Sequence, residues 1–352
     1  MTDRATSHES RATVADFTER ELIARIERCL PPPPEWLPVG IGDDAAVVVP
    51  ERNRLQVLSV DALVEGVHFD RAFTTPGAIG HRALAVNLSD LAAMGAEPRL
   101  CLLSMALPPA WPVAEFDAMV GGFTALAARH RVHLAGGNLT RSPGPLLVDV
   151  TVSGGLKRRH VLTRGGARPG DELYVTGSLG AAAAGLQMLR EATEAGSEDG
   201  AVRASEPGCA RRYLYPEPRV RMGLLIGRNR AASACIDLSD GLADGVHRIA
   251  DGSGVGAIID AEALPIEPAA RAWFLQHGAD PTTAAITGGD DYELLFAVRP
   301  RTRNRLKAAS RHGDAPMTRI GVCTADRAVI LRCGAGDRPT DRPMPAGYSH
   351  FR

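Results

Sequence analysis

Segments with strand patterns and segments with helix patterns alternate along both halves of this 352-residue chain. A chain of this length exceeds what one hydrophobic core usually holds, so we expect two domains. The alternation predicts an α/β or α+β class. Strand patterns lie at 45–50, 55–63, 146–156, 172–177, 234–238, 256–260, 293–298 and 318–333, and helix patterns at 19–30, 77–95, 111–130, 181–195 and 242–250.

The composition changes at residues 157–171, which are basic and rich in turn residues. We therefore predict an N-terminal domain over 17–156 and a C-terminal domain over 157–352. The polar stretch 196–207 is predicted to be mobile, and the sequence assigns no role to residues 191–207.

The segment 77–95 is apolar nearly all round, which predicts a buried helix. Thr75 is a suitable cap, Pro76 suits the first helical turn, and Gly95 suits the position just past the end. Asp90 lies inside this apolar helix. A carboxylate in such a place needs a partner.

Aspartates end five apolar or glycine-containing segments of the chain, at Asp44, Asp61, Asp90, Asp237 with Asp240, and Asp291. Taken alone, Asp240 is explained equally well as the cap of the helix 242–250, and residues 42–44 as a simple turn. Capping explains neither Asp90 nor the recurrence of the pattern. Metal binding is the interpretation that covers the whole set.

The type of donor indicates which metal. Carboxylates without nearby His or Cys favour Mg²⁺, which works in proteins with few carboxylates, water and substrate phosphates. The six cysteines have no zinc-type spacing. Nucleotide and phosphoryl chemistry is therefore predicted, although a Walker A loop and kinase catalytic-loop signatures are absent. We interpret TGSLG at 176–180 as a packing turn.

The charges exclude one class of partner. Forty basic and forty-one acidic residues leave a net charge of −1, so nucleic acid is not an expected partner. We find no apolar run of membrane-spanning length and no secretory signal in the polar N-terminal residues. We expect a cytoplasmic protein that does not bind membranes.

Five motifs occur in the order GIGDD, VEGVHF, NLSDLAAMGAEP, IDLSDG and GGDDYELLF. In this set the chain resembles the thiamine-monophosphate kinase family, within the superfamily of aminoimidazole ribonucleotide synthetase, over residues 17–351. The resemblance implies a two-domain architecture whose N-terminal domain pairs its sheet across a homodimer. It also implies direct in-line transfer of the γ-phosphoryl group of ATP to thiamine monophosphate, assisted by several Mg²⁺ ions.

The resemblance also implies roles for individual residues. Matching Mg²⁺-site positions are Asp44, Ser59, Val60, Asp61, Asp90, Asn138, Asp237 and Asp240. Matching ATP positions are Gly137, Asn138, Arg164 and Ser239, and matching thiamine-phosphate positions are His68, Asp290 and Tyr348. On residue type alone, His68 could instead be a satisfied loop histidine and Tyr348 could simply pack the C-terminal tail.

The chain departs from the family pattern at three of these positions. Asn138 stands where the family has a metal-ligand Asp, Val60 where it usually has Thr, and Asp290 where Glu is more usual. An Asn carbonyl can bind Mg²⁺ but brings no negative charge. Two alternatives to a working kinase therefore stay open: a weakened relative that only binds nucleotide or thiamine phosphates, and a superfamily member that activates another substrate with ATP.

Overall fold

The computed structural model describes residues 12–196, 208–334 and 339–348. The chain divides into two compact units, Met1–Asn87 with Pro98–Gly155, and Leu88–Glu97 with Leu156–Arg352. The predicted domain bounds, 17–156 and 157–352, stay a prediction. None of the helices in these ranges is long and apolar enough to cross a membrane.

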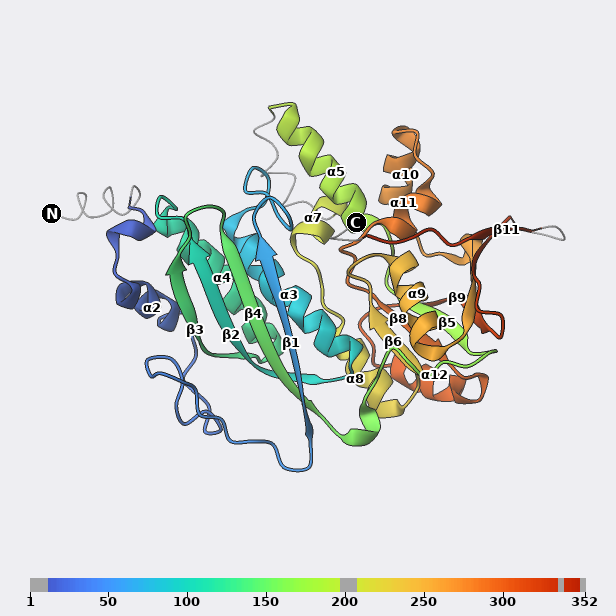
Figure 1. Cartoon of the computed structure of the whole chain (residues 1–352), viewed down its shortest axis with the longest axis horizontal. Coiled ribbons are helices and arrows are strands. Elements are labelled where there is room, and N and C mark those ends of the chain that lie inside the picture. The colour runs from blue at the N-terminus through green and yellow to red at the C-terminus, as the bar shows by residue number, and fades with distance from the viewer. Residues whose placement is uncertain (1–11, 197–207, 335–338, 349–352) are drawn as a thin grey trace. The chain divides into compact units, whose positions relative to one another are not determined.

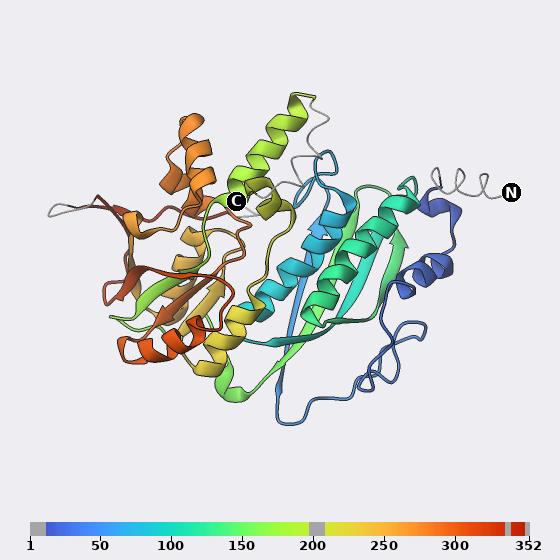
Figure 2. The same ribbon diagram turned by 180° about the vertical axis from the view of Figure 1, so that it is seen from behind.

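The first unit contains a four-stranded sheet in the order β1-β4-β2-β3. Helices α3 and α4 lie across one face of this sheet, as Figures 1 and 2 show from its two sides. The 3₁₀ helix η1 and helix α2 precede the sheet. The bounds are η1 Val14–Asp16, α2 Glu19–Glu27, β1 Leu55–Val64, α3 Pro76–Ala93, β2 Glu97–Leu107, α4 Val113–His130, β3 His133–Arg141 and β4 Leu147–Leu156.

The ends of α3 are formed as predicted. The Thr75 hydroxyl accepts a hydrogen bond from the Ala78 amide, 3.3 Å away, in the first turn. At the other end Gly95 has φ +71°, and the Ala96 amide donates to the Leu91 carbonyl at 2.8 Å. A left-handed glycine with this hydrogen bond is the common way to end a helix.

Glycines allow α3 and α4 to approach each other closely. A Cβ on Gly80 would lie 1.9 Å from the Met119 carbonyl oxygen. A Cβ on Gly122 would lie 2.0 Å from the Gly77 carbonyl oxygen. Larger residues at these positions would push the two helix backbones apart.

The second unit contains a seven-stranded sheet in the order β11-β10-β7-β9-β5-β8-β6. Its neighbours pair antiparallel, except that β7 and β10 are parallel. The strands are β5 Glu172–Thr176, β6 Ala234–Asp237, β7 Gly256–Asp260, β8 Leu294–Val298, β9 Met317–Thr324, β10 Val329–Cys333 and β11 Thr340–Pro343.

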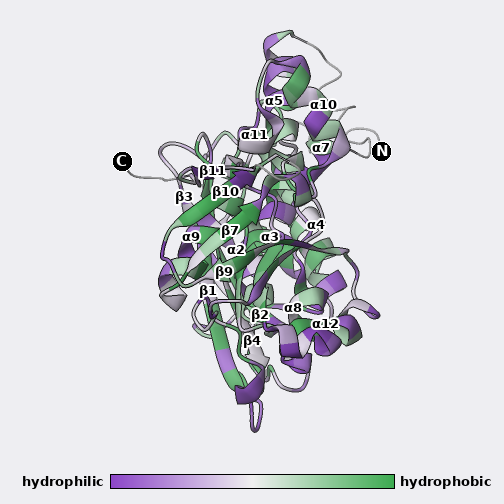
Figure 3. Ribbon diagram, turned by 90° about the vertical axis from the view of Figure 1, so that its right-hand side faces the viewer, coloured by the Kyte–Doolittle hydropathy of each residue, from purple (hydrophilic) through white to green (hydrophobic). Residues whose placement is uncertain are grey.

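The core of the second unit lies between this sheet and its helices. Strands β7 and β10 are largely hydrophobic (Figure 3), and every residue of β8 is buried. The apolar side of α9 (Leu242–Ser253) packs on the sheet through Val246 and Ile249. The other helices in the described part of this unit are η2 Arg158–His160, α5 Ala181–Glu194, α7 Cys209–Leu214, α8 Val220–Asn229, η3 Ala261–Ala263, α10 Pro268–Gln276, α11 Pro281–Thr287, η4 Pro300–Thr302 and α12 Arg303–Ser310.

The predicted class is confirmed, with several differences in the elements. The strand predicted at 45–50 is wrong, since that segment forms only an isolated bridge from Val47 to Val39. The elements that were not predicted include strands β2, β3 and β11 and helices α7, α8, α11 and α12. The stretch predicted to be mobile, 196–207, lies outside the described residues except for Gly196.

Adjacent glycines in α4 provide a matched test of the close helix packing. We expect Gly122→Ala to lower the free energy of unfolding by about 1–3 kcal/mol, because the new methyl group meets the Gly77 carbonyl. Gly121→Ala, where no atom lies within 4 Å, should instead raise stability by up to about 1 kcal/mol. Urea unfolding of both variants measures the difference. Equal effects would contradict this account.

Candidate active site

Strand β6 ends in a carboxylate with a buried partner. All four residues of β6 are buried, and Asp237 is only 6% exposed. Its Oδ2 accepts a hydrogen bond from the Ser89 hydroxyl at 2.7 Å. Ser89 is fully buried in the part of α3 that belongs to the second unit, beside Asp90. A buried carboxylate needs such a donor, and this contact joins the NLSD and IDLSD motifs.

The turn after β6 leads into α9 through a glycine. Gly241, with φ +92°, is the N-cap residue of α9, so the capping interpretation of Asp240 is wrong. A Cβ on Gly241 would lie 2.7 Å from the Gly288 carbonyl oxygen. The Arg248 guanidinium lies 3.7 Å from Oδ2 of Asp240 and also pairs with Asp244. Asp240 is therefore part of a turn that is closely packed but not the cap of the helix.

The GGDDYE segment binds the backbone of this turn. The Asp290 amide donates to the Ser239 carbonyl at 2.8 Å, and the Tyr292 amide donates to the Leu238 carbonyl at 3.0 Å. Both Asp290 and Tyr292 have left-handed backbones, with φ +68° and +49°. Each such non-glycine residue costs about 1–3 kcal/mol and persists only where surrounding contacts fix it. The Tyr292 hydroxyl also donates to Oδ1 of Asp290 at 3.1 Å.

Asp291 and Glu293, which alternate with Asp290 and Tyr292 along this segment, are buried in the protein. Asp291 is 3% exposed and accepts from the Gly180 amide at 2.8 Å and from the Ala182 amide at 3.3 Å. Burial raises the pKa of Asp291 to about 7, although the two amides act in the opposite direction. TGSLG is thus a packing turn, and its last glycine is bound by Asp291.

Glu293 is fully buried between two arginines. It accepts from the Arg212 guanidinium at 2.6 Å, from Nε of Arg219 at 2.6 Å, and from the Thr176 hydroxyl at 2.7 Å. The sequence analysis assigned no role to Glu293 or to these arginines. A Glu directly before a fully buried strand was the available signal, since a buried Glu requires cations.

Near the end of the described chain, Tyr348 lies beside the same turn. Its amide donates to the Asp240 carbonyl at 3.3 Å, and its side chain is 51% exposed. The second unit therefore brings six of the predicted site positions to one end of β6 and β8. These are Asp90, Asp237, Ser239, Asp240, Asp290 and Tyr348.

The backbone of Arg164 lies away from this group of residues. Its carbonyl accepts from the Ser253 hydroxyl at 3.3 Å, at the last residue of α9. Asp240 precedes the first residue of the same helix, and twelve helical residues span about 18 Å. The Arg164 side chain is exposed. Its contact with ATP stays a prediction.

The predicted positions of the first unit lie on two edge strands and in loops. Ser59, Val60 and Asp61 are on β1, whereas Gly137 and Asn138 are on β3, at the opposite edge of the sheet. Three strand spacings separate these edges, or about 14 Å. Within one unit, therefore, Asp61 and Asn138 do not converge on one ion.

Local contacts explain two further residue types in the first unit. A Cβ on Gly137 would lie 1.8 Å from the Leu103 carbonyl oxygen, so this position requires glycine. The Val64 amide donates to Nδ1 of His68 at 3.1 Å, which leaves the proton of the neutral ring on Nε2. Asp44 is exposed in the loop before β1. The roles of Gly137, His68 and Asp44 in binding stay predictions.

The donors of the candidate site suit a hard cation. The side chains at the end of β6 and β8 offer carboxylate and hydroxyl oxygens, which Mg²⁺ prefers. Val60 has no donor in its side chain, so only its main-chain carbonyl could contribute. Among residues 12–196, 208–334 and 339–348, no group of three His, Cys, Asp or Glu side chains is arranged to hold a metal ion.

A double-mutant cycle tests the buried contact of this site. Ser89→Ala should lower the free energy of unfolding in EDTA by about 1.5–3 kcal/mol, because the Asp237 carboxylate loses its hydroxyl donor. In an Asp237→Ala background the same substitution should cost almost nothing. Urea unfolding of the four proteins gives the coupling energy. Additive costs would show that the two side chains do not interact.

Both halves of the chain match known protein families. Residues 42–156 match the family described as AIR synthase related protein, N-terminal domain. Residues 168–334 match the AIR synthase related protein, C-terminal domain. The two matches together cover most of the sequence.

Curated and solved proteins are similar over nearly the whole chain. The thiamine-monophosphate kinase of Bacillus subtilis strain 168 is 35% identical over 323 residues, 89% of this chain and 94% of that protein. The crystal structure of thiamine-monophosphate kinase from Stenotrophomonas maltophilia K279a is 37% identical, with a TM-score of 0.74 over 89% and 94% of the chains. The structure of AaThiL complexed with AMPPCP and TMP is 29% identical, with a TM-score of 0.69 over 90% and 94%.

Proposed function

Because the chain belongs to the thiamine-monophosphate kinases within the AIR synthase related family, we propose that it transfers the γ-phosphoryl group of ATP to thiamine monophosphate, giving thiamine diphosphate. The observation that carries the proposal is the set of oxygen donors at the end of β6 and β8, with Asp237 fixed by Ser89. The related structure with AMPPCP and TMP supports both substrates.

The acceptor needs no general base. A phosphate monoester has a second pKa near 6, so it is mostly a dianion at neutral pH and already nucleophilic. The barrier to overcome is the repulsion between two anions. Bound Mg²⁺ would supply charge neutralisation at the phosphate oxygens. The chain's own residues then have to hold the cations and align the two phosphates for in-line transfer.

We assign these tasks to the predicted site residues. Asp90, Asp237 and Asp240 of the second unit and Asp44, Ser59 and Asp61 of the first would hold Mg²⁺. Ser89 orients the Asp237 carboxylate. Gly137, Asn138, Arg164 and Ser239 would contact ATP, and His68, Asp290 and Tyr348 would contact thiamine monophosphate.

We also propose a homodimer formed through the sheet of the first unit. Leu58 and Val60 of β1 are 64% and 57% exposed, and Leu102 of β2 is 39% exposed. Such apolar side chains suit an interface. The separation of Asp61 from Asn138 within one unit also favours a site completed by a second copy. Sedimentation velocity tests this, because a single 37.2 kDa species would contradict it. The use of ATP supports a cytoplasmic location.

The first experiment follows both products of the proposed reaction. With ATP, thiamine monophosphate and Mg²⁺, thiamine diphosphate and ADP should form in equal amounts, and both should disappear with EDTA. Nucleotide binding without either product would favour the weakened relative. ADP formation that requires a different acceptor would favour another superfamily activity.

Asn138→Asp tests the departure from the family pattern. If Asn138 contributes to a metal site, the added carboxylate strengthens Mg²⁺ binding, so half-maximal activity should need several-fold less Mg²⁺. Asn229→Asp, in α8, is the matched control for one added charge elsewhere. An unchanged Mg²⁺ dependence for Asn138→Asp would make Asn138 incidental to the metal site.

A further inference from the structure

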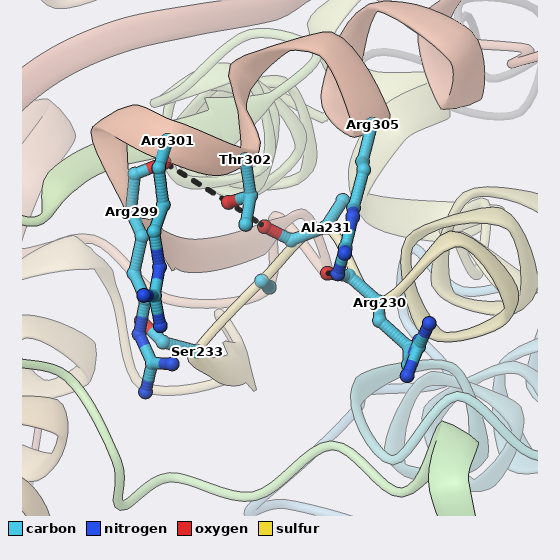
Figure 4. Close-up of a pocket in the computed structure, with 8 residues that line it drawn as sticks. Arg230, Ala231, Ser233, Arg299, Arg301, Thr302 and Arg305 are labelled. Atoms are coloured by element: carbon cyan, nitrogen blue, oxygen red, sulfur yellow. Dashed lines mark hydrogen bonds between the residues drawn. The ribbon is translucent and has the colours of Figure 1, made fainter.

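A cavity of the second unit is lined by four arginines. Its volume is about 520 Å³, within the range of small-molecule sites. Lining residues come from the connection between α8 and β6 and from the segment that follows β8. They are Arg230, Ala231, Ala232, Ser233, Arg299, Arg301, Thr302 and Arg305 (Figure 4).

This cavity lies away from the candidate active site. Ser233 directly precedes β6, and Arg299 directly follows β8. The two strands are antiparallel, so Ala234 pairs with Ala297 at this end and Asp237 pairs with Leu294 at the other. The four residues of β6 thus place roughly 10 Å between the arginines and the aspartate end.

The frame of the cavity is fixed by hydrogen bonds. The Thr302 hydroxyl lies 3.2 Å from the Ala231 carbonyl and 2.9 Å from the Arg299 carbonyl. The contact with the Ala231 carbonyl holds η4 against the residues before β6, whereas the contact with the Arg299 carbonyl is local to η4 (dashed lines in Figure 4). The Ser233 hydroxyl donates to Oδ2 of Asp171 at 2.6 Å. These hydrogen bonds fix the backbone that frames the cavity, on which the arginine side chains are carried.

In the described ranges the arginines of the cavity lack carboxylate partners, although Arg305 donates from Nη1 to the Arg230 carbonyl at 3.5 Å. Arg303, on the same segment, donates from Nε to Glu172 at 2.7 Å. In the described ranges no carboxylate forms an ion pair with Arg230, Arg299, Arg301 or Arg305. The Nε of Arg299 is buried without a hydrogen-bond partner among the residues that the structure describes.

Four guanidinium groups around one concavity repel each other unless an anion lies among them. Figure 4 shows Arg299 and Arg301 side by side and reaching toward Ser233, whereas Arg305 reaches the Arg230 carbonyl and the Arg230 guanidinium points away from Arg299 and Arg301. Guanidinium groups form paired, charge-assisted hydrogen bonds with phosphate oxygens. Among the described residues no aromatic side chain lines the cavity, so none of them would stack on a base or a thiazolium ring.

We propose that this cavity binds a compact polyphosphate group directly through its arginines, without a metal ion. The site is separate from the candidate active site and does not depend on the proposed kinase activity. The chain's net charge of −1 makes general attraction of anions an insufficient explanation for binding there.

Calorimetry with inorganic diphosphate in EDTA tests the proposal. The full-length protein should bind with a dissociation constant of about 1 mM or tighter. Arg301→Gln with Arg305→Gln should weaken binding at least about tenfold, since each guanidinium supplies charged hydrogen bonds. The control, Arg311→Gln with Arg327→Gln, removes two exposed arginines outside the cavity and should bind as the parent does.

The outcomes separate the proposal from its alternatives. Unfolding curves and kinase activity should be unchanged in both double variants, because Arg301 and Arg305 are exposed and distant from Asp237. Absence of binding to the parent protein, undiminished binding to the cavity variant, or equal weakening in the control would each overturn the proposal. Equal weakening of diphosphate binding in the two double variants would mean that surface charge in general attracts the diphosphate.

Discussion

The buried carboxylate of Glu293 is the constraint on which the candidate site depends. It sits directly before β8 and binds Thr176 at the end of β5, Arg212 of α7 and Arg219 just before α8. A buried charge that loses a partner destabilises a protein by about 3–5 kcal/mol. These contacts therefore fix where β8 begins, and with it the position of the preceding GGDDY residues.

Because the Glu293 side chain is fixed in this way, the residues one and three positions earlier can hold strained backbone conformations. Tyr292 and Asp290 have left-handed backbones, while Asp291 between them is held by the amides of Gly180 and Ala182. Anchored and strained residues thus alternate along this segment. As a result, Asp290 lies at the surface of the site while the chain on both sides of it is fixed. The turn after β6 receives its shape from the same segment, through the bond of the Asp290 amide to the Ser239 carbonyl. The position of Ser239 and Asp240 therefore follows from contacts made by residues without an assigned chemical role.

Sequence patterns predicted those helices and strands that are fixed by contacts between residues close in sequence. The helix 77–95 was predicted because Thr75, Pro76 and Gly95 act through neighbouring backbone groups. By contrast, the valines at 45–50 suggested a strand, but Val47 and Val49 are about half exposed and the segment forms a single bridge. Strand β3 was missed because its GGN sequence has neither alternation nor β-branched residues.

The sequence suggested residue types for the site, whereas it did not suggest the contacts between them. The recurring aspartates indicated a metal-dependent site, and the motif order indicated the family. The donor to Asp237 is Ser89, 148 residues earlier, and no spacing rule connects them. Likewise, only the strand order shows that Asp61 and Asn138 lie on opposite edges of one sheet. Long-range pairings of this kind follow from topology, which a single sequence does not specify.

The two ends of β6 and β8 make opposite demands on an anionic ligand. At the Asp237 end, carboxylates repel a phosphate, so binding there requires cations between protein and ligand. At the Arg299 end, guanidinium groups can contact phosphate oxygens directly. Removal of divalent ions should therefore abolish phosphate binding at the first end and leave it intact at the second, which makes metal dependence the property that distinguishes the two sites.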